Sequence, residues 1–243
     1  QDPFRGRAVA QKVGDRWMVQ NRPMRPLTTA EFDLVNELPY TREPHRMYDR
    51  LGGIPAAEEV RFSINSTRGC FGSCAFCAIH AHQGRIVQAR SEASMVREAR
   101  ELTAHPKFKG YIHDVSGPTG NFRGPSCPDQ LVRGCCKNRE CLFPSPCPHM
   151  KPDHSEFIRL LRKLRALPGV KKVFIRSGLR YDYILADPDG DRFIEELCRY
   201  HVSGQLRVAP EHASPKVLRL MGKPPIEEYL RFKERFELSL IHI

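Results

Sequence analysis

The chain has 243 residues, of which 40% are hydrophobic, and a formal net charge of +11 at pH 7. Its apolar runs fall short of the roughly 20 residues that a membrane-spanning helix needs, and residues 1–12 lack the apolar segment of a secretory signal. Nine cysteines without such a signal favour metal binding over disulfides. We therefore expect a cytoplasmic globular protein without a membrane segment, and so basic a chain suits an anionic partner such as nucleic acid.

Residues 1–55 predict an irregular arm with a strand at 17–20 and a helix that starts near Thr29, with Thr28 or Thr29 as its N-cap. From residue 56 onward, short β-rich segments alternate with amphipathic segments. This alternation predicts a parallel sheet with right-handed crossovers, in which active residues follow the carboxyl ends of the strands. The predicted strands are 60–65, 111–115, 172–177 and 205–208, and the predicted helices are 92–103, 155–167, 192–201, 215–221 and 226–236.

Three cysteines, Cys70, Cys74 and Cys77, follow the first of these strands in the run RGCFGSCAFC. Thiolates suit zinc or iron-sulfur clusters, and a 4Fe-4S cluster takes one cysteine per iron, so three ligands leave one iron open. Structural zinc sites use paired C-x2-C ligands, and the bacterial ferredoxin run is C-x2-C-x2-C. The spacing C-x3-C-x2-C therefore favours a 4Fe-4S cluster, with structural zinc as the alternative and a disulfide as the least favoured outcome.

A second cysteine group lies in a segment at about 122–152 that is rich in proline, glycine and charge, which argues against a packed helix. An irregular connection of this length usually has a function or is held in place by a cross-link. Four thiolates would complete a tetrahedral zinc site or a fully ligated auxiliary 4Fe-4S cluster. The cysteines of this segment are Cys127, Cys135, Cys136, Cys141 and Cys147.

The first cysteine run resembles the signature of the radical S-adenosylmethionine (radical SAM) superfamily, and the chain as a whole resembles the YgiQ-like family of uncharacterised radical SAM proteins. The similarity covers residues 37–237, including GGIPAAEEVRFSINSTRGCFGSCAFCAIHAHQGR and HVSGQLRVAPEHASPKVLRLMGKP. The resemblance implies an α/β fold, an incomplete (β/α) radical SAM partial barrel with a Cys-rich insertion. Residues 56–237 would form this truncated core, 1–55 an arm left from a preceding region, and 238–243 a non-native tail.

The resemblance also implies the cofactors, a 4Fe-4S cluster on Cys70, Cys74 and Cys77 together with S-adenosylmethionine (SAM), and an electron donor such as flavodoxin or ferredoxin. Many members carry a Gly-Gly-Glu turn where this chain has Gly117, Pro118 and Thr119, which leaves the methionine amino group of SAM to carbonyls or to the Thr119 hydroxyl. The other residues implied at the SAM site are Phe76, Ser177, Arg180 and Glu211. Of these, Ser177 and Arg180, together with Asp182, would meet the ribose and the carboxylate of SAM, since a guanidinium fork suits a carboxylate. The family pattern matches Cys127, Cys136, Cys141 and Cys147 as the second metal site, and leaves Cys135 as an extra.

Three functions stay open at this point. The first is a radical SAM enzyme of unknown substrate, which this truncated chain need not support by itself. The second is a tRNA-modifying or nucleic-acid-modifying enzyme of the methylthiotransferase kind, similar around APEHASPKVLRLMGK. The third is a noncatalytic module in which the cysteines bind zinc or iron-sulfur clusters.

Overall fold

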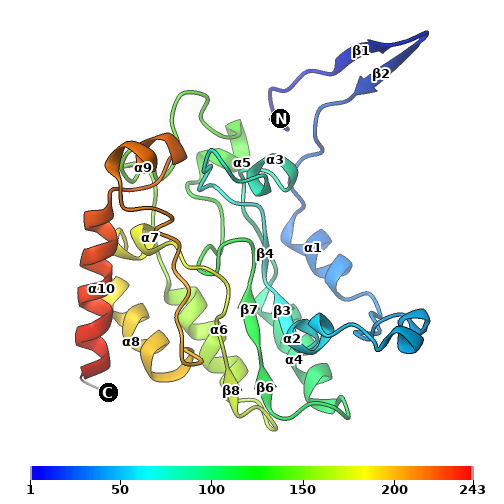
Figure 1. Cartoon of the computed structure of the whole chain (residues 1–243), viewed down its shortest axis with the longest axis vertical. Helices are drawn as coiled ribbons and strands as arrows, with labels where there is room; N and C mark the ends of the chain where they lie inside the picture. The colour runs from blue at the N-terminus through cyan, green and yellow to red at the C-terminus, as the bar shows by residue number, and fades with distance from the viewer. Residues whose placement is uncertain (1, 242–243) are drawn as a thin grey trace.

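Short parallel strands form the centre of the computed structural model, which describes residues 2–241 (Figure 1). These strands are β3 (Ser63–Asn65), β6 (Tyr111–Ile112), β7 (Asp114–Ser116) and β8 (Lys172–Val173). β3 pairs with β7 and β6 pairs with β8, both in parallel. Because only His113 separates β6 from β7, the two pairs form one layer in the order β3, β6–β7, β8. Among residues 2–241 these strands do not close into a barrel, and the layer continues beyond β8 only as a parallel bridge from Leu179 to Val208.

The helices that follow the strands supply the apolar side of the main core. They are α4 (Glu92–Ala104), α6 (Ser155–Arg165), α7 (Tyr181–Leu185), α8 (Gly190–Tyr200) and α10 (Ile226–Ile241). The α6 helix shows the pattern best, because its apolar residues at helical spacing, from Phe157 to Leu164, are buried while its basic residues face outward. The buried side chains of these helices and of the strands form one cluster, and α10 contributes Phe232 to it.

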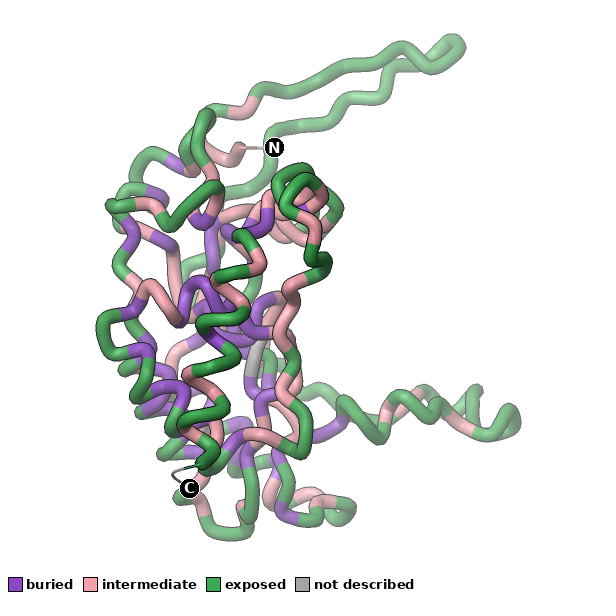
Figure 2. Tube along the Cα trace, turned by 60° about the vertical axis from the view of Figure 1, so that its left-hand side comes forward, coloured by how far each residue is buried: buried purple, intermediate pink, exposed green. Residues whose placement is uncertain are grey.

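The N-terminal arm projects from this core (Figure 1). Its first part is an antiparallel hairpin of β1 (Val9–Val13) and β2 (Arg16–Gln20), joined by a two-residue loop in which Gly14 has the positive φ of 62° that such loops require. Both faces of the hairpin are exposed, as the green tube in Figure 2 shows. Helix α1 (Thr29–Asn36) follows, and Thr28 and Glu31 form a capping box at its start, which confirms Thr28 as the N-cap.

Shorter elements connect these parts. They are a 3-10 helix at Arg46–Leu51, α2 (Ala56–Val60), β4 (Thr67–Arg68), α3 (Ile79–His82), β5 (Gln88–Ala89), α5 (Asp129–Arg133) and α9 (Pro215–Met221). The strands β4 and β5 pair antiparallel and form the two sides of the segment that carries the first cysteine group. Figure 1 shows α3, α5 and α9 together at the end of the molecule towards which the parallel strands run.

The alternation of strands and helices predicted from the sequence is confirmed, but several boundaries were wrong. Residues 56–60 form a helix, so the first parallel strand begins at Ser63, and the strand predicted at 172–177 is limited to Lys172–Val173. Residues 205–208 form no strand, because only the single Leu179 bridge runs beside them. The helix predicted at 226–236 extends to Ile241, and residues 242–243 of the expected tail lie outside the described residues.

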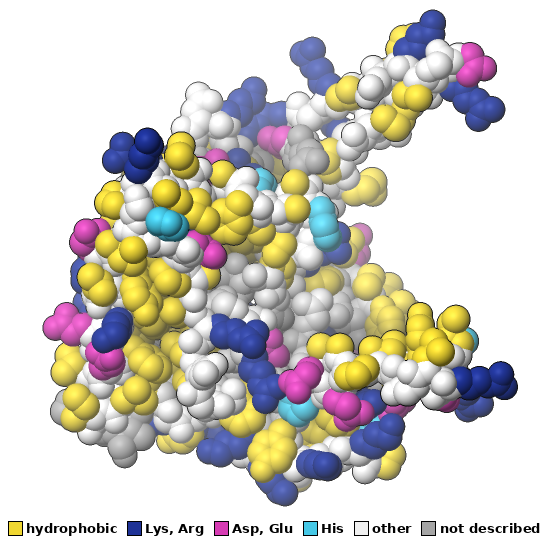
Figure 3. All heavy atoms as spheres, in the orientation of Figure 1, with side chains coloured by type: hydrophobic (Ala, Val, Ile, Leu, Met, Phe, Trp, Pro, Cys, Tyr) yellow, Lys and Arg dark blue, Asp and Glu magenta, His cyan; other side chains and the backbone are white. Residues whose placement is uncertain are grey.

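Two surface properties bear on location and partners. None of the helices in the described part of the chain is long and apolar enough to cross a membrane. On the face drawn in Figure 3, Lys and Arg side chains are scattered over the core and the tips of the arms, and do not form one continuous basic surface. The positive charge on this face is therefore dispersed, which is the distribution expected of solvent-exposed helix surfaces.

Candidate functional site

The first cysteine group lies in a loop at the carboxyl ends of the parallel strands, directly after β4. Backbone hydrogen bonds fix this loop from two sides. On one side the Cys70 amide donates to the Gly84 carbonyl over 3.0 Å, and on the other the Ala75 amide donates over 3.0 Å to the Met221 carbonyl at the end of α9. The loop is thus held between the segment that leads into β5 and a helix that is far away in the sequence.

Two glycines allow the loop to take this path. Gly69 has a φ of +89°, and a Cβ atom there would lie 2.4 Å from the Ile86 carbonyl oxygen. Gly72 has an ordinary φ, but a Cβ atom would lie 2.7 Å from Nη1 of Arg180 and 3.3 Å from Sγ of Cys70. Gly69 therefore meets a backbone requirement, whereas Gly72 makes room for a guanidinium group.

The three thiols of the loop are electrostatic neighbours. Burial raises the pKa of the Cys74 thiol, while Arg180 and Lys223 act in the opposite direction and the neighbouring Cys70 and Cys77 thiols add to the rise. All three side chains are partly buried. A ligand that carries positive charge would relieve the mutual repulsion of three thiolates at this place.

Polar groups approach the sulfur of Cys70 as well. The Thr119 hydroxyl oxygen lies 3.3 Å from Cys70 Sγ, and the Gly72 amide donates to the same sulfur over 3.4 Å. Thr119 is buried, so the structure brings it to the cysteine loop from the turn after β7. Its neighbour Gly117 packs against Thr67, since a Cβ atom at Gly117 would lie 2.1 Å from the Thr67 hydroxyl oxygen.

Arg180 is a buried cation that reaches the loop. Its guanidinium group binds Asp182 through two hydrogen bonds, Nε to Oδ1 at 2.8 Å and Nη2 to Oδ2 at 2.6 Å. Nη1 points the other way and donates to Sγ of Cys74 over 3.5 Å. The fork that was expected to meet the SAM carboxylate is therefore occupied by Asp182.

The remaining predicted SAM residues lie in three places. Phe76 is exposed, Lys223 Nζ lies 6.0 Å from the centre of its ring, and the same Nζ lies 3.3 Å from Oε1 of Glu211. These residues therefore share one side of the loop. Ser177 lies elsewhere, where its hydroxyl donates to Asp114 Oδ2 over 2.6 Å. Pro118 and Gly117 line a separate small pocket of about 270 Å³.

Sequence reasoning missed Lys223 and the scaffold behind Arg180. Lys223 is buried and donates over 2.7 Å to the Ala209 carbonyl, a contact that requires α9 to fold back. Asn121 fixes the backbone of Arg180 at both its amide and its carbonyl, and His154 follows at 3.1 Å from the Asn121 amide. No local pattern reveals these contacts, because the partners come from distant segments.

An aromatic cluster supports both cysteine groups. Phe71 stacks on Phe122 with ring centres 3.7 Å apart, and Tyr183 meets both rings edge-on. Phe71 and Phe122 are fully buried. The partly buried side chains packed against this cluster include Cys70 from the first group and Cys141 and Cys147 from the second. The two cysteine groups are thus attached to one apolar platform.

In the second group, the side-chain contacts also involve Cys135, the cysteine that the family pattern leaves as an extra. The amide nitrogen Nε2 of Gln130 lies 3.6 Å from Cys135 Sγ and 3.7 Å from Cys141 Sγ. Burial raises the pKa of Cys141, and the nearby Cys127 and Cys147 thiols raise it further. Cys136 is exposed.

The segment contains one short helix, α5, in which Gln130 is the one buried residue, so it is not the packed helix that the sequence argued against. Helix α5 is a single turn, Asp129–Arg133, and it places Gln130 beside the sulfur atoms of Cys135 and Cys141. In the described part of the chain, no three Cys, His, Asp or Glu side chains converge as ligands of one metal ion would. An iron-sulfur cube binds each thiolate at a separate iron, so it does not require such convergence.

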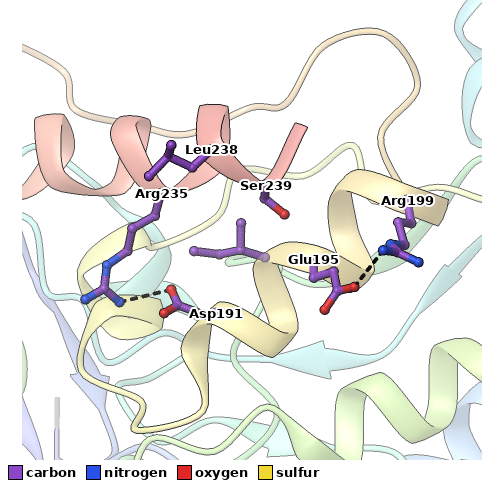
Figure 4. A pocket seen from close by; sticks show the side chains of 7 residues that line it. Asp191, Glu195, Arg199, Arg235, Leu238 and Ser239 are labelled. Carbon is purple, nitrogen blue, oxygen red and sulfur yellow. Dashed lines mark hydrogen bonds and ion pairs between the residues drawn. The ribbon is translucent and has the colours of Figure 1, made fainter. Parts of the chain in front are cut away.

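The cavities do not all belong to this site. The crevice in Figure 4, about 380 Å³ between α8 and α10, contains two ion pairs of its own, Arg235 with Asp191 and Arg199 with Glu195. It includes no cysteine. A larger chamber of about 590 Å³ lies between the N-terminal arm, the residues after Cys77 and the loop of the second cysteine group.

Comparison with known proteins identifies the family. The sequence profile of the radical SAM superfamily matches residues 64–236, and that of the radical SAM N-terminal region matches residues 1–63. The chain belongs to the radical SAM superfamily. It is 56% identical over 236 residues to a UPF0313 protein of Clostridium perfringens (strain ATCC 13124) and 53% identical to one of Clostridium botulinum (strain Okra), in each case over 97% of the chain. The resemblance to the YgiQ-like radical SAM proteins is thereby confirmed.

Membership in the radical SAM superfamily accounts for the open layer of parallel strands, since the superfamily domain has a partial barrel of α/β type. The chain spans 36% of the length of these relatives. The residues fit a 4Fe-4S cluster: three partly buried thiols in one fixed loop, with N–H donors from Gly72 and Arg180 directed at two of the sulfurs.

Proposed function

We propose that this chain carries the SAM-cleaving centre of a radical SAM enzyme, in which Cys70, Cys74 and Cys77 bind a 4Fe-4S cluster. The observation that supports the proposal is the fixed loop of three neighbouring thiols at the carboxyl ends of parallel strands. When bound, the cluster would supply one electron that cleaves SAM to methionine and a 5′-deoxyadenosyl radical. A flavodoxin or ferredoxin would deliver that electron in the cytoplasm, where we place the protein.

The residues around the loop would bind and orient SAM. We assign the Thr119 hydroxyl to the methionine amino group, because it lies beside Cys70 at the turn after β7. The exposed Phe76 ring would cover the adenine, and Glu211 at the same side of the loop would accept from the nucleoside. Gly117 and Pro118 would leave the backbone of their turn accessible to SAM. The Ser177 hydroxyl oxygen would accept a hydrogen bond from a ribose hydroxyl of SAM while its own hydrogen is donated to Asp114.

For the second cysteine group we propose an auxiliary 4Fe-4S cluster or a zinc ion, bound by Cys127, Cys136, Cys141 and Cys147. This set requires the exposed side chain of Cys136 to turn inward, whereas Cys135 already lies beside Gln130. Metal counts on Cys135→Ala and Cys136→Ala of the full-length protein separate the two sets. We expect the Cys136 variant to lose the second metal; retention of that metal, with its loss in the Cys135 variant, would contradict the proposed set.

The test of the main proposal is the formation of 5′-deoxyadenosine by the full-length protein, reconstituted without oxygen and reduced with dithionite in the presence of SAM. Wild type and Cys198→Ala should form it, since Cys198 lies in α8 with its sulfur 4.0 Å from the Phe236 carbonyl. Cys74→Ala should not. Equal product from Cys74→Ala and wild type, or none from wild type that contains a full complement of iron, would refute the proposed function.

A further inference from the structure

The strongest unexplained feature of the site is a buried ion pair that touches one of the proposed ligands. Arg180 and Asp182 are 5% and 3% exposed, and two parallel hydrogen bonds join them. Burial alone would lower the pKa of Arg180, but the Asp182 carboxylate more than compensates, so the pKa is raised and the guanidinium keeps its charge. A pair of this kind has a high desolvation cost, so its presence beside the cysteine loop calls for a local reason.

The geometry supplies that reason through the third nitrogen of the guanidinium. Nη1 takes no part in the pair with Asp182 and lies 3.5 Å from Sγ of Cys74, the middle cysteine of the loop. Among the contacts described, this sulfur is the only acceptor within hydrogen-bond reach of Nη1 in residues 2–241. The pair is therefore a fixed dipole with its positive end at the sulfur.

Other parts of the structure hold this dipole in place. Asn121 accepts from the Arg180 amide over 2.9 Å and donates to the Arg180 carbonyl over 3.2 Å. Behind Asn121, His154 is fixed by Asp187 at 2.6 Å. Gly72 leaves the space that Nη1 occupies, since its missing Cβ atom would lie 2.7 Å away.

We infer that Arg180 is a positioning residue that tunes the cluster through Cys74, and that it does not bind the carboxylate of SAM. This inference rests on the proposed function. An N–H donor directed at a ligand sulfur withdraws charge from it and stabilises the reduced, more negative cluster, which raises the reduction potential. Asp182 holds the donor and partly offsets its charge.

Three variants of the full-length protein test this role by an EPR-monitored redox titration of the reconstituted cluster. Arg180→Gln removes the charge and should make the midpoint potential more negative. Gly72→Ala keeps Arg180 and Asp182 but places a methyl group against Nη1, so it should shift the potential in the same direction. Asp182→Asn leaves the cation less neutralised and should make the potential more positive.

The affinity for SAM separates this role from carboxylate binding. Loss of a charged, two-bonded contact to SAM would weaken binding by about 10-fold to 150-fold, whereas the tuning role leaves the dissociation constant of SAM near the wild-type value in Arg180→Gln. The matched control is Arg176→Gln, because Arg176 pairs with the exposed Glu59 and not with the cysteine loop. It should change neither quantity.

A large loss of SAM affinity at an unchanged potential would overturn the inference, and so would shifts of the same sign in Gly72→Ala and Asp182→Asn. If Arg180→Gln does not fold, the opposite signs expected for the other two variants decide the matter. A wild-type protein without any cluster signal would refute the proposed function and this inference together. A wild-type signal that none of the variants shifts would refute the inference alone.

Discussion

The aromatic platform under Cys70 predicts that one buried ring controls how tightly iron is held. The change is Phe71→Leu in the full-length protein. It removes three buried carbons, worth about 2 kcal/mol at ~0.8 kcal/mol each. The stack on Phe122 at 3.7 Å adds about 1 kcal/mol. We therefore expect the free energy of unfolding to fall by about 3 kcal/mol, and the platform beneath Cys70 to loosen.

The matched control is Phe157→Leu, because Phe157 is equally buried, lies 5.8 Å from the Phe193 ring and belongs to the main core. Its cost in unfolding free energy should be similar. The assay compares urea unfolding with the rate at which a chelator removes iron under native conditions. Phe71→Leu should release iron several times faster than Phe157→Leu at equal stability. Equal rates would show that iron release follows global stability, and would refute the role of the platform.

Two further predictions concern the fold around the site. The pKa of Glu196 is lowered to about 2, because hydrogen bonds and charge from His201 and Arg162 outweigh the effect of burial. The stability that the Glu196 carboxylate contributes is therefore present above its unfolded pKa of about 4.5, and it is lost as the pH falls towards 2. Urea unfolding of Glu196→Gln should show a flatter pH dependence between pH 5 and 2, and an unchanged slope would contradict this. Gly69→Ala should lower the free energy of unfolding by more than about 2 kcal/mol, because of the positive φ and the contact with the Ile86 carbonyl; a loss below 1 kcal/mol would count against the described loop.

The sequence predicted the elements whose signals are local. The apolar spacing in 155–167 gave α6 and the capping residues at Thr28 gave the start of α1. The parallel strands were found but their lengths were not, because a buried strand ends where its partner ends and the partner lies far away in the chain. Residues 205–208 have the composition of a strand, yet they find only Leu179 beside them.

The candidate site shows the same contrast between local signals, which the sequence reveals, and contacts between distant segments, which it does not. The spacing of Cys70, Cys74 and Cys77 was sufficient to point to a cluster, and the strand-end rule placed Thr119 and Arg180 near it. Arg180 and Asp182 were both expected to contact SAM, but the structure joins them to each other through two hydrogen bonds. Gly72 and Lys223 could not be assigned from the sequence, since their partners Arg180 and Ala209 reach them only through the tertiary fold.

The central claim is that the three-cysteine loop holds a 4Fe-4S cluster with one iron free to bind SAM. Electron-nuclear double resonance on the reduced full-length protein, with SAM that carries nitrogen-15 in its amino group, tests it most directly. We predict a hyperfine coupling between that nitrogen and the cluster, absent in Cys74→Ala and retained in Cys198→Ala. A fully assembled cluster whose spectrum shows no coupling to the labelled nitrogen would contradict the claim.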